Sequence, residues 1–184
     1  DKGIVARALG LWFVGYSQAD ECDPVFDHLR DRQALGREHY VARYQLAIDA
    51  ENFRLARWLG KSIDTRHVAA AESWLRASEH PEDFLRAYES LDDDEGARQR
   101  LAYAARRLTY RDAELAYALW SKVRPRFGFE PATLDLTDRH IALWTARDGL
   151  PGAWSQLARL PHSALDAEVL RWRARSSLKD GAAE

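Results

Sequence analysis

Histidine and cysteine are the side chains that most often bind zinc in proteins, and they can also pair as base and nucleophile. Their positions in this 184-residue sequence decide whether such a site could form. Cys22 is the only cysteine, and no two histidines stand four residues apart, so the His-Glu-x-x-His pattern of zinc enzymes is absent. We therefore predict no metal site, because its ligands would have to come from distant parts of the chain. The histidines are His28, His39, His67, His80, His140 and His162.

Other motifs for catalysis are also missing. No glycine-rich segment is followed by Lys-Ser or Lys-Thr, as a phosphate-binding loop requires. No Gly-x-Ser-x-Gly occurs, so there is no nucleophile elbow. From the residues alone we expect no catalytic residue, no cofactor and no cofactor-binding residue in this chain.

Three groups of residues favour a structural interpretation over a chemical one. The acidic run from Asp92 to Glu95 lacks the alternating ligands and turn glycine of a calcium loop, so we predict a solvated loop that places negative charge at a helix N-terminus. Arg98, Arg100, Arg106 and Arg107 are offset by nearby acids and predict a solvated face. The tryptophans have helix-core spacing, which favours burial over sugar stacking: Trp12, Trp58, Trp74, Trp120, Trp144, Trp154 and Trp172.

Composition and charge exclude several classes of protein. Lys and Arg number 27 against 29 Asp and Glu, and this balance argues against a dedicated nucleic-acid-binding protein. Hydrophobic residues make up 46% of the chain, too many for a disordered tail. The most apolar run, residues 8–15, is shorter than the roughly 18 residues that a membrane span needs. We predict no nucleic-acid partner and no membrane span.

The elements that would position any site are predicted to be helices. The chain has 30 Ala and 23 Leu but only 16 β-branched residues, which favours helix. Apolar residues recur every three or four positions along most of the chain. The predicted helices are 4–16, one that begins at Asp23-Pro24, 38–50, 53–61, 66–78, 82–91, 95–108, 112–124, 136–147, 151–158 and 165–178.

Several of these helices have recognisable first residues. We predict N-caps at Asp23, at Asn52, at Asp64 or Thr65, and at Ser163 with Asp166 three residues on. In the helix that follows Asn52, the spacing predicts that Leu55, Trp58 and Leu59 are buried.

The turns between helices recur at a roughly constant interval. Turns at Asn52, Pro81, Asp112 and Asp148 are 29, 31 and 36 residues apart, and similar Leu-Ala and Trp positions flank three of them. Helical hairpins of this length stack because one hairpin cannot bury its own apolar face. We expect an all-α, right-handed, solenoid-like superhelix of irregular hairpins, with about 10–12 helices.

One segment resembles a known family. Gly15-Tyr16-Ser17-Gln18, followed by Cys22-Asp23-Pro24-Val25-Phe26, is similar to a motif of soluble lytic murein transglycosylases, which show Gly-x-Ser-Gln and then Cys-Asp-x-x-Phe. A second similarity is Leu157-Ala158-Arg159-Leu160-Pro161, followed by Arg171-Trp172-Arg173. The first motif departs from the family at Ala19, where proline is common.

The resemblance implies a role in the bacterial periplasm. The chain begins at Asp1 and contains no Met, so we expect a fragment or a processed chain. The resemblance implies that residues 1–184 are a single superhelical segment from the N-terminal region of a larger protein. The resemblance implies that a catalytic domain follows and cleaves the β-1,4 bond between N-acetylmuramic acid and N-acetylglucosamine, leaving 1,6-anhydro products. One Glu then acts as acid and base. The implied partners are peptidoglycan strands and that catalytic domain.

The family's catalytic Glu is not matched here. It lies in a Glu-Ser pair with Gly-Leu-Met-Gln downstream. The pairs Glu72-Ser73 and Glu89-Ser90 have no such sequel, since the chain has no Met. We expect this chain alone to be inactive. The resemblance also implies a disulfide from Cys22 to a cysteine outside the chain.

Two functions stay open at this point. The chain is either the non-catalytic superhelical segment of a lytic transglycosylase, or a helical-repeat adaptor that binds protein partners on its concave face.

Overall fold

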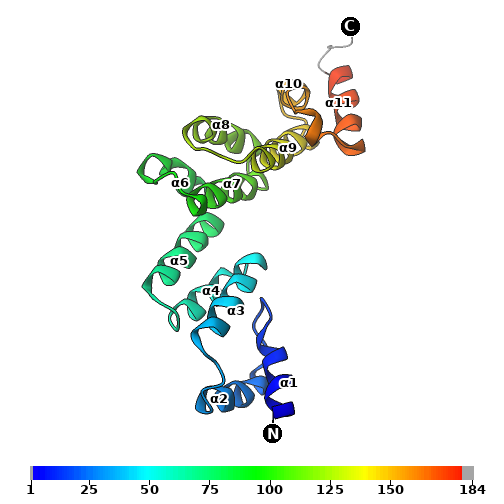
Figure 1. The fold of residues 1–184 in the computed structure, drawn as a ribbon. Coiled ribbons are helices and arrows are strands. Elements are labelled where there is room, and N and C mark those ends of the chain that lie inside the picture. Colours follow the sequence, from blue (N-terminus) through cyan, green and yellow to red (C-terminus); the bar gives the residue numbers. More distant parts are fainter. Residues whose placement is uncertain (1, 180–184) are drawn as a thin grey trace. The chain divides into compact units, whose positions relative to one another are not determined.

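The computed structural model describes residues 2–179, and within this range the chain forms helices and no strand (Figure 1). The predicted all-α class is confirmed, and the helices of this range fall within the predicted number. The α-helices are α1 Lys2–Trp12, α2 Asp23–Asp31, α3 Arg37–Asp49, α4 Phe53–Gly60, α5 Thr65–Glu79, α6 Pro81–Arg86, α7 Glu95–Thr109, α8 Ala113–Val123, α9 Pro131–Arg147, α10 Ala153–Ala158 and α11 Ala167–Lys179.

The chain divides into two compact units, residues 1–75 and 76–184, and the boundary falls within α5. Each unit has its own hydrophobic core. The prediction of one continuous superhelical segment, and of its right-handed course, stays a prediction.

The first unit is built around Trp12 at the end of α1. The indole ring is fully buried, and its Nε1 donates a hydrogen bond of 3.1 Å to the backbone oxygen of His39 in α3. Helices α3 and α4 pack closely against each other. Apolar residues from one face of each helix form this core, because burying that face removes it from water: Ala8, Phe26, Leu29, Tyr44, Ala47, Leu55, Ala56, Leu59 and Ala71.

The second unit packs α7, α8 and α9 against one another, with α6 on α7 and with α10 and α11 beside α9 (Figure 1). Two pairs of consecutive helices, α7 with α8 and α9 with α10, pack against each other. Buried Thr109 and Thr145 donate their hydroxyls to the carbonyls of Ala105 and Ile141, so these two buried hydroxyl groups are satisfied.

Side-chain caps begin several helices: those at Asn52 and Asp64 were predicted from the sequence, and the one at Asp112 was not. The Oδ1 atoms of Asn52 and Asp112 accept hydrogen bonds from the backbone N–H groups of Leu55 (3.2 Å) and Leu115 (2.8 Å). At α5 the capping side chain is that of Asp64, not Thr65. These residues satisfy amides that have no partner inside the helix.

Two predicted caps are wrong. Asp23 lies inside the first turn of α2, because a short 3₁₀ turn at Asp20–Cys22 leads directly into the helix. Ser163 lies in another 3₁₀ turn and donates its hydroxyl to Asp135 at 2.5 Å. Asp166, three residues later, caps α11 by accepting from Val169 N at 2.9 Å.

Some helix boundaries also differ from the prediction. α1 ends at Trp12 instead of Tyr16, since the chain turns away to bring Gly15 against α3. α6 ends at Arg86 and is followed by a 3₁₀ turn over Tyr88–Ser90. α9 begins at Pro131, five residues early, because proline fits a first turn that needs no N–H.

Ion pairs hold the start of α11 to α9. Arg139 pairs with Asp166 at 2.5 Å and with Glu168 at 3.0 Å, and Arg147 pairs with Glu168 at 2.5 Å. The apolar part of the same contact includes fully buried Val169 and half-buried Trp172. The four charged side chains therefore lie at the rim of the apolar contact between α9 and α11.

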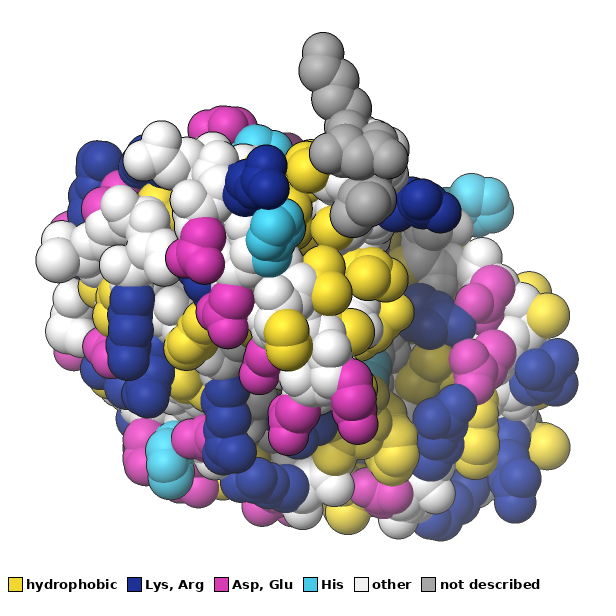
Figure 2. All heavy atoms as spheres, turned by 90° about the horizontal axis from the view of Figure 1, so that it is seen from below, with side chains coloured by type: hydrophobic (Ala, Val, Ile, Leu, Met, Phe, Trp, Pro, Cys, Tyr) yellow, Lys and Arg dark blue, Asp and Glu magenta, His cyan; other side chains and the backbone are white. Residues whose placement is uncertain are grey.

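The surface is mixed in charge. Figure 2 shows Lys and Arg side chains interspersed with Asp and Glu over the face in view, as the near-equal numbers of the two signs lead one to expect. Among the described residues, no helix is long and apolar enough to cross a membrane.

Candidate ligand-binding groove

The Gly-x-Ser-Gln motif lies in the segment that joins α1 to α2, and its glycine packs against α3. A Cβ atom on Gly15 would lie 2.3 Å from the carbonyl oxygen of Leu46 and 2.8 Å from Cβ of Ala50. Only glycine fits at this approach. Gln18 then donates its side-chain amide to the carbonyl of Leu11 at 3.2 Å, which fixes the turn to the end of α1.

The Cys-Asp-x-x-Phe motif continues this arrangement into α2. Phe26 is buried and meets Trp12 edge-on, with the ring centroids 5.4 Å apart. Cys22 is half-buried against the same core and forms no disulfide among the described residues. The Cys-Asp-x-x-Phe motif therefore contributes Phe26 and Cys22 to the core of the first unit.

Arg43 of α3 packs against the rings of Trp12 and Phe26. Its guanidinium carbon is 4.4 Å from the ring centroid of Trp12 and 5.3 Å from that of Phe26. Its Nη2 donates a long hydrogen bond of 3.3 Å to the carbonyl of Tyr16. Only 3% of the residue is exposed.

The hydrogen-bonding capacity of Arg43 is largely unused. Its Nε is buried and finds no acceptor among residues 2–179, and in that range no carboxylate forms an ion pair with it. Burial lowers the pKa of the guanidinium from its ordinary value, since the desolvated charge is costly. Buried arginines are usually paired with carboxylates, so this cation is unusual.

A groove of about 700 Å³ opens above Arg43, and its lining lies wholly within the first unit. The wall that belongs to α4 carries Trp58, which is 48% exposed. The prediction that Trp58 is buried is wrong, since α4 covers the core with Leu55 and Leu59 and turns Trp58 outward. The other polar lining residues are Ser17, Gln18, Asp20, Asp23, Asp27, Arg30, Asn52 and Arg54.

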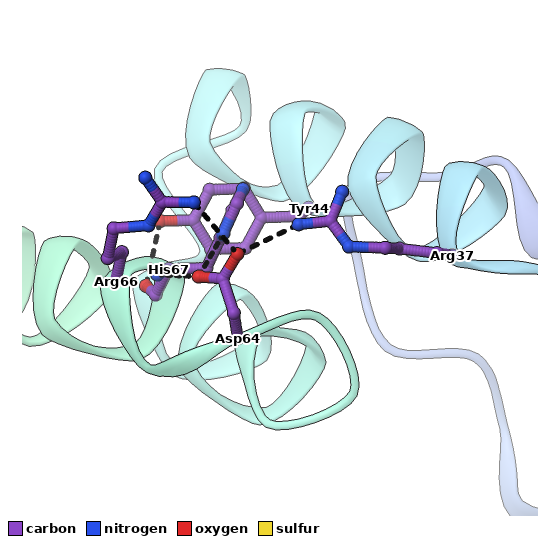
Figure 3. Close-up of polar contacts among 5 residues, drawn as sticks. All are labelled: Arg37, Tyr44, Asp64, Arg66 and His67. Atoms are coloured by element: carbon purple, nitrogen blue, oxygen red, sulfur yellow. Dashed lines mark hydrogen bonds and ion pairs between the residues drawn. The ribbon is translucent and has the colours of Figure 1, made fainter.

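A polar cluster lies elsewhere in the first unit. Three side chains contact the carboxylate of Asp64 (Figure 3). Nη2 of Arg37 and Nδ1 of His67 each lie 2.8 Å from a carboxylate oxygen, and Nη2 of Arg66 lies 3.8 Å away. The hydrogen bond from the His67 side chain, followed by that from its backbone N–H, holds the pKa of Asp64 well below its usual range. Tyr44 donates to the His67 carbonyl at 3.1 Å. The cluster fastens α3 to the start of α5.

The second unit has a smaller cavity of about 100 Å³ beside Asp138. The Asp138 carboxylate accepts from Trp120 Nε1 at 2.7 Å and pairs with Arg124 at 2.8 Å. Burial raises the pKa of Asp138, and the hydrogen bond from Trp120 and the charge of Arg124 partly offset this effect. These contacts tie α8 to α9 and leave no carboxylate oxygen without a partner.

Neither Glu-Ser pair lines the groove beside Arg43 or the cavity beside Asp138. Glu72 is exposed in the middle of α5, and Glu89 lies in a surface turn where it accepts from the Tyr88 hydroxyl at 3.1 Å. Ser73 is buried within α5. The structure does not bring these residues together.

The acidic run is more ordered than predicted. Asp94 caps α7 by accepting from Ala97 N at 2.7 Å, which confirms negative charge at a helix N-terminus. Asp93 is not merely solvated, since it binds the side chain of Arg98 and the backbone N–H of Gly128, each at 2.9 Å. Arg106 is half-buried and donates to Thr137, so the predicted solvated arginine face is wrong in part.

The histidines do not gather. His28, His80 and His162 are exposed on separate helices or turns, and His39 binds the backbone N–H of Gly36. His140 packs against Tyr110, and its buried Nε2 has no hydrogen-bond partner within the described range. In that range no three His, Cys, Asp or Glu residues form a group that could hold a metal ion.

Sequence reasoning missed Arg43 and the groove. Arg43 lies between apolar positions of α3, and its pairing with Trp12 joins residues 31 positions apart in the chain. The sequence does place two aromatic residues, Trp12 and Phe26, close to the family motif. This pattern indicates that the segment is important, but it does not show that Arg43 of α3 packs against it.

Comparison with known proteins gives structural neighbours only. No protein-family model matches the chain, and no curated protein is significantly similar in sequence. Among solved structures, an inactive mutant of the lytic transglycosylase Slt from Pseudomonas aeruginosa matches 97% of this chain with a TM-score of 0.67 and 25% identity.

Two further structures share the fold. One is the 70-kDa soluble lytic transglycosylase in complex with bulgecin A, at a TM-score of 0.60 and 19% identity over 99% of this chain. The other is the enzyme Slt70 from Escherichia coli, at 0.57 and 20% over 97%. The chain spans 29%, 35% and 34% of the three proteins, about a third of their length. The resemblance to soluble lytic transglycosylases that the Cys22 segment indicates is thus confirmed over nearly the whole chain.

Proposed function

We propose that this chain is the non-catalytic helical segment of a periplasmic soluble lytic transglycosylase. The observation that carries the proposal is the similarity to the Pseudomonas aeruginosa enzyme, which extends over 97% of this chain but only 29% of that protein. The role of the segment is to hold glycan strands and to position a catalytic domain elsewhere in the same protein.

The chemistry belongs to that other domain. Its reaction breaks the β-1,4 bond between N-acetylmuramic acid and N-acetylglucosamine, with a Glu that first donates and then accepts a proton. The hydroxyl of the substrate itself attacks, so a single carboxyl group suffices and a 1,6-anhydro ring forms. Glu72 and Glu89 lack surroundings for this role, because one is exposed on a helix and the other in a turn.

The test compares the full-length protein with the 184-residue chain. Each is incubated with purified peptidoglycan sacculi, and the soluble products are analysed by mass spectrometry for anhydro-muropeptides. Products from the full-length protein alone support the proposal. Products from the 184-residue chain contradict its non-catalytic role, and a folded full-length protein that releases none favours the adaptor function instead.

A further inference from the structure

The inference begins with a buried cation that has unused donors. Arg43 is 3% exposed, makes one long hydrogen bond and has no carboxylate partner in the part of the chain that the structure describes. Its stacking on Trp12 holds the plane of the guanidinium in place. An acceptor that carries negative charge would meet a fixed, water-poor donor here.

The space above Arg43 is large enough for a ligand. Pockets that hold small molecules commonly measure 300–1,000 Å³, and this groove measures about 700 Å³. Arg43 lines it together with Trp58, whose exposed indole offers a flat apolar surface. Such a surface suits the apolar face of a sugar ring.

The remaining lining residues point to a ligand with many hydroxyl groups. Asp20 and Asp23 are exposed acceptors, and Ser17 and Gln18 can donate or accept. Acidic residues would repel a simple anion, but they accept hydrogen bonds from sugar hydroxyls. A ligand with one carboxylate and several hydroxyls fits both parts of the groove.

We propose that this groove binds a carboxylate-bearing saccharide, with the carboxylate on Arg43 and a sugar ring on Trp58. The identity of the saccharide rests on the proposed function. In peptidoglycan the carboxylate has two sources, the lactyl group of N-acetylmuramic acid in strands without peptide, and the carboxylates of an attached peptide.

The binding test uses three probes on the 184-residue chain. N-acetylmuramic acid carries the lactyl carboxylate, N-acetylglucosamine lacks it, and a muramyl dipeptide carries its free carboxylate on the peptide. Each is titrated while the indole N–H signals are followed by NMR. We expect at least one acidic probe to bind about tenfold or more tightly than N-acetylglucosamine, because a charge-assisted hydrogen bond is lost with the carboxylate.

The two acidic probes distinguish the sources. Tighter binding of N-acetylmuramic acid assigns the lactyl group, and tighter binding of the dipeptide assigns the peptide. Equal affinity for all three probes, or no binding of any, overturns the proposal.

Variants test the two named contacts. Arg43→Met removes the charge and nearly conserves the volume, and it is expected to abolish the preference for acidic probes. Trp58→Ala is expected to weaken all three probes by about fivefold or more, since an exposed side chain is removed without disturbing the core. Leu170→Ala, at an exposed position of the second unit, is the control and should bind as the unaltered chain does.

If Arg43→Met does not fold, the probe comparison on the unaltered chain still decides the matter. These are binding measurements, so their failure is distinct from a failure of the cleavage test: the full-length protein can be a lytic transglycosylase while this groove binds nothing.

Discussion

The guanidinium carbon of Arg43 lies 4.4 Å from the ring centroid of Trp12, and both side chains are almost completely buried. The pair joins the end of α1 to the middle of α3. It gives the first unit a charged core residue whose Nε, within the described range, has no acceptor.

The first prediction concerns the stability of this pair. Arg43→Met replaces a poorly satisfied buried charge by an apolar side chain of similar length, so the free energy of unfolding should stay equal or rise by about 1 kcal/mol. Arg43→Lys should lower it by about 1–2 kcal/mol, since an ammonium is more strongly hydrated and stacks less well. Urea denaturation followed by circular dichroism measures both.

A loss of more than about 1 kcal/mol in Arg43→Met would show that the cation supports the fold.

The second prediction concerns the close approach at Gly15. Gly15→Ala places a Cβ 2.3 Å from Leu46 O, so we expect a loss of about 2–3 kcal/mol in the free energy of unfolding. Gly10→Ala is the matched control, because Gly10 lies in α1 with nothing within 4 Å of its added Cβ. It should gain about 0.5–1 kcal/mol from helix propensity. Equal effects of the two substitutions would contradict the packing account.

The third prediction concerns acid and Asp64. Its pKa is lowered in the folded chain, so the stabilisation is present above the pKa of the unfolded chain, near 3.9. It is lost as the pH falls through the folded value. Asp64→Asn keeps a capping oxygen but removes the charge that Arg37 and His67 contact.

We expect the variant to be less stable than the unaltered chain at pH 7 and the difference to shrink below about pH 4. Urea midpoints at pH 7 and pH 3 give this comparison. A difference that does not change with pH would contradict it.

The fourth prediction concerns His140. Burial, followed by the charge of Arg106, lowers its pKa from 6.5 to about 4. Protonation therefore favours the unfolded chain, and stability that is complete above pH 6.5 is lost as the pH falls toward 4. His140→Phe should remove about 1–2 kcal/mol of this pH dependence, a figure reduced for partial exposure of the ring.

The same variant should be at least as stable as the unaltered chain at pH 5, since a phenyl ring has no buried nitrogen without a hydrogen-bond partner. Unfolding free energies at pH 7 and pH 5 check this. An unaltered pH dependence in the variant would assign the effect to another group.

Features of the fold that depend only on neighbouring residues, such as helix caps, could be predicted from the sequence. Asn52 and Asp64 cap their helices as predicted, because the N–H group that each accepts from lies only three residues further along the chain. The predicted cap at Ser163 was wrong for a non-local reason: its hydroxyl donates a hydrogen bond to the carboxylate of Asp135, 28 residues away. The predicted burial of Trp58 was wrong because the spacing of apolar residues shows which face of α4 is buried but not how wide that face is.

The all-α class followed from composition, and the family resemblance from two short motifs. The groove could not be predicted, since it depends on Arg43 meeting Trp12 across two separate helices. An arginine among apolar positions gives the same pattern whether it reaches solvent or lies over a ring.

The attachment of α11 to α9 combines two forces that salt affects in opposite directions. Dissolved ions screen the partly exposed pairs of Arg139 and Arg147 with Glu168. Sulfate strengthens the burial of Val169 and its apolar neighbours. The last helix should thus loosen in sodium chloride yet tighten in ammonium sulfate, so the choice of anion, rather than ionic strength alone, sets how firmly it is docked.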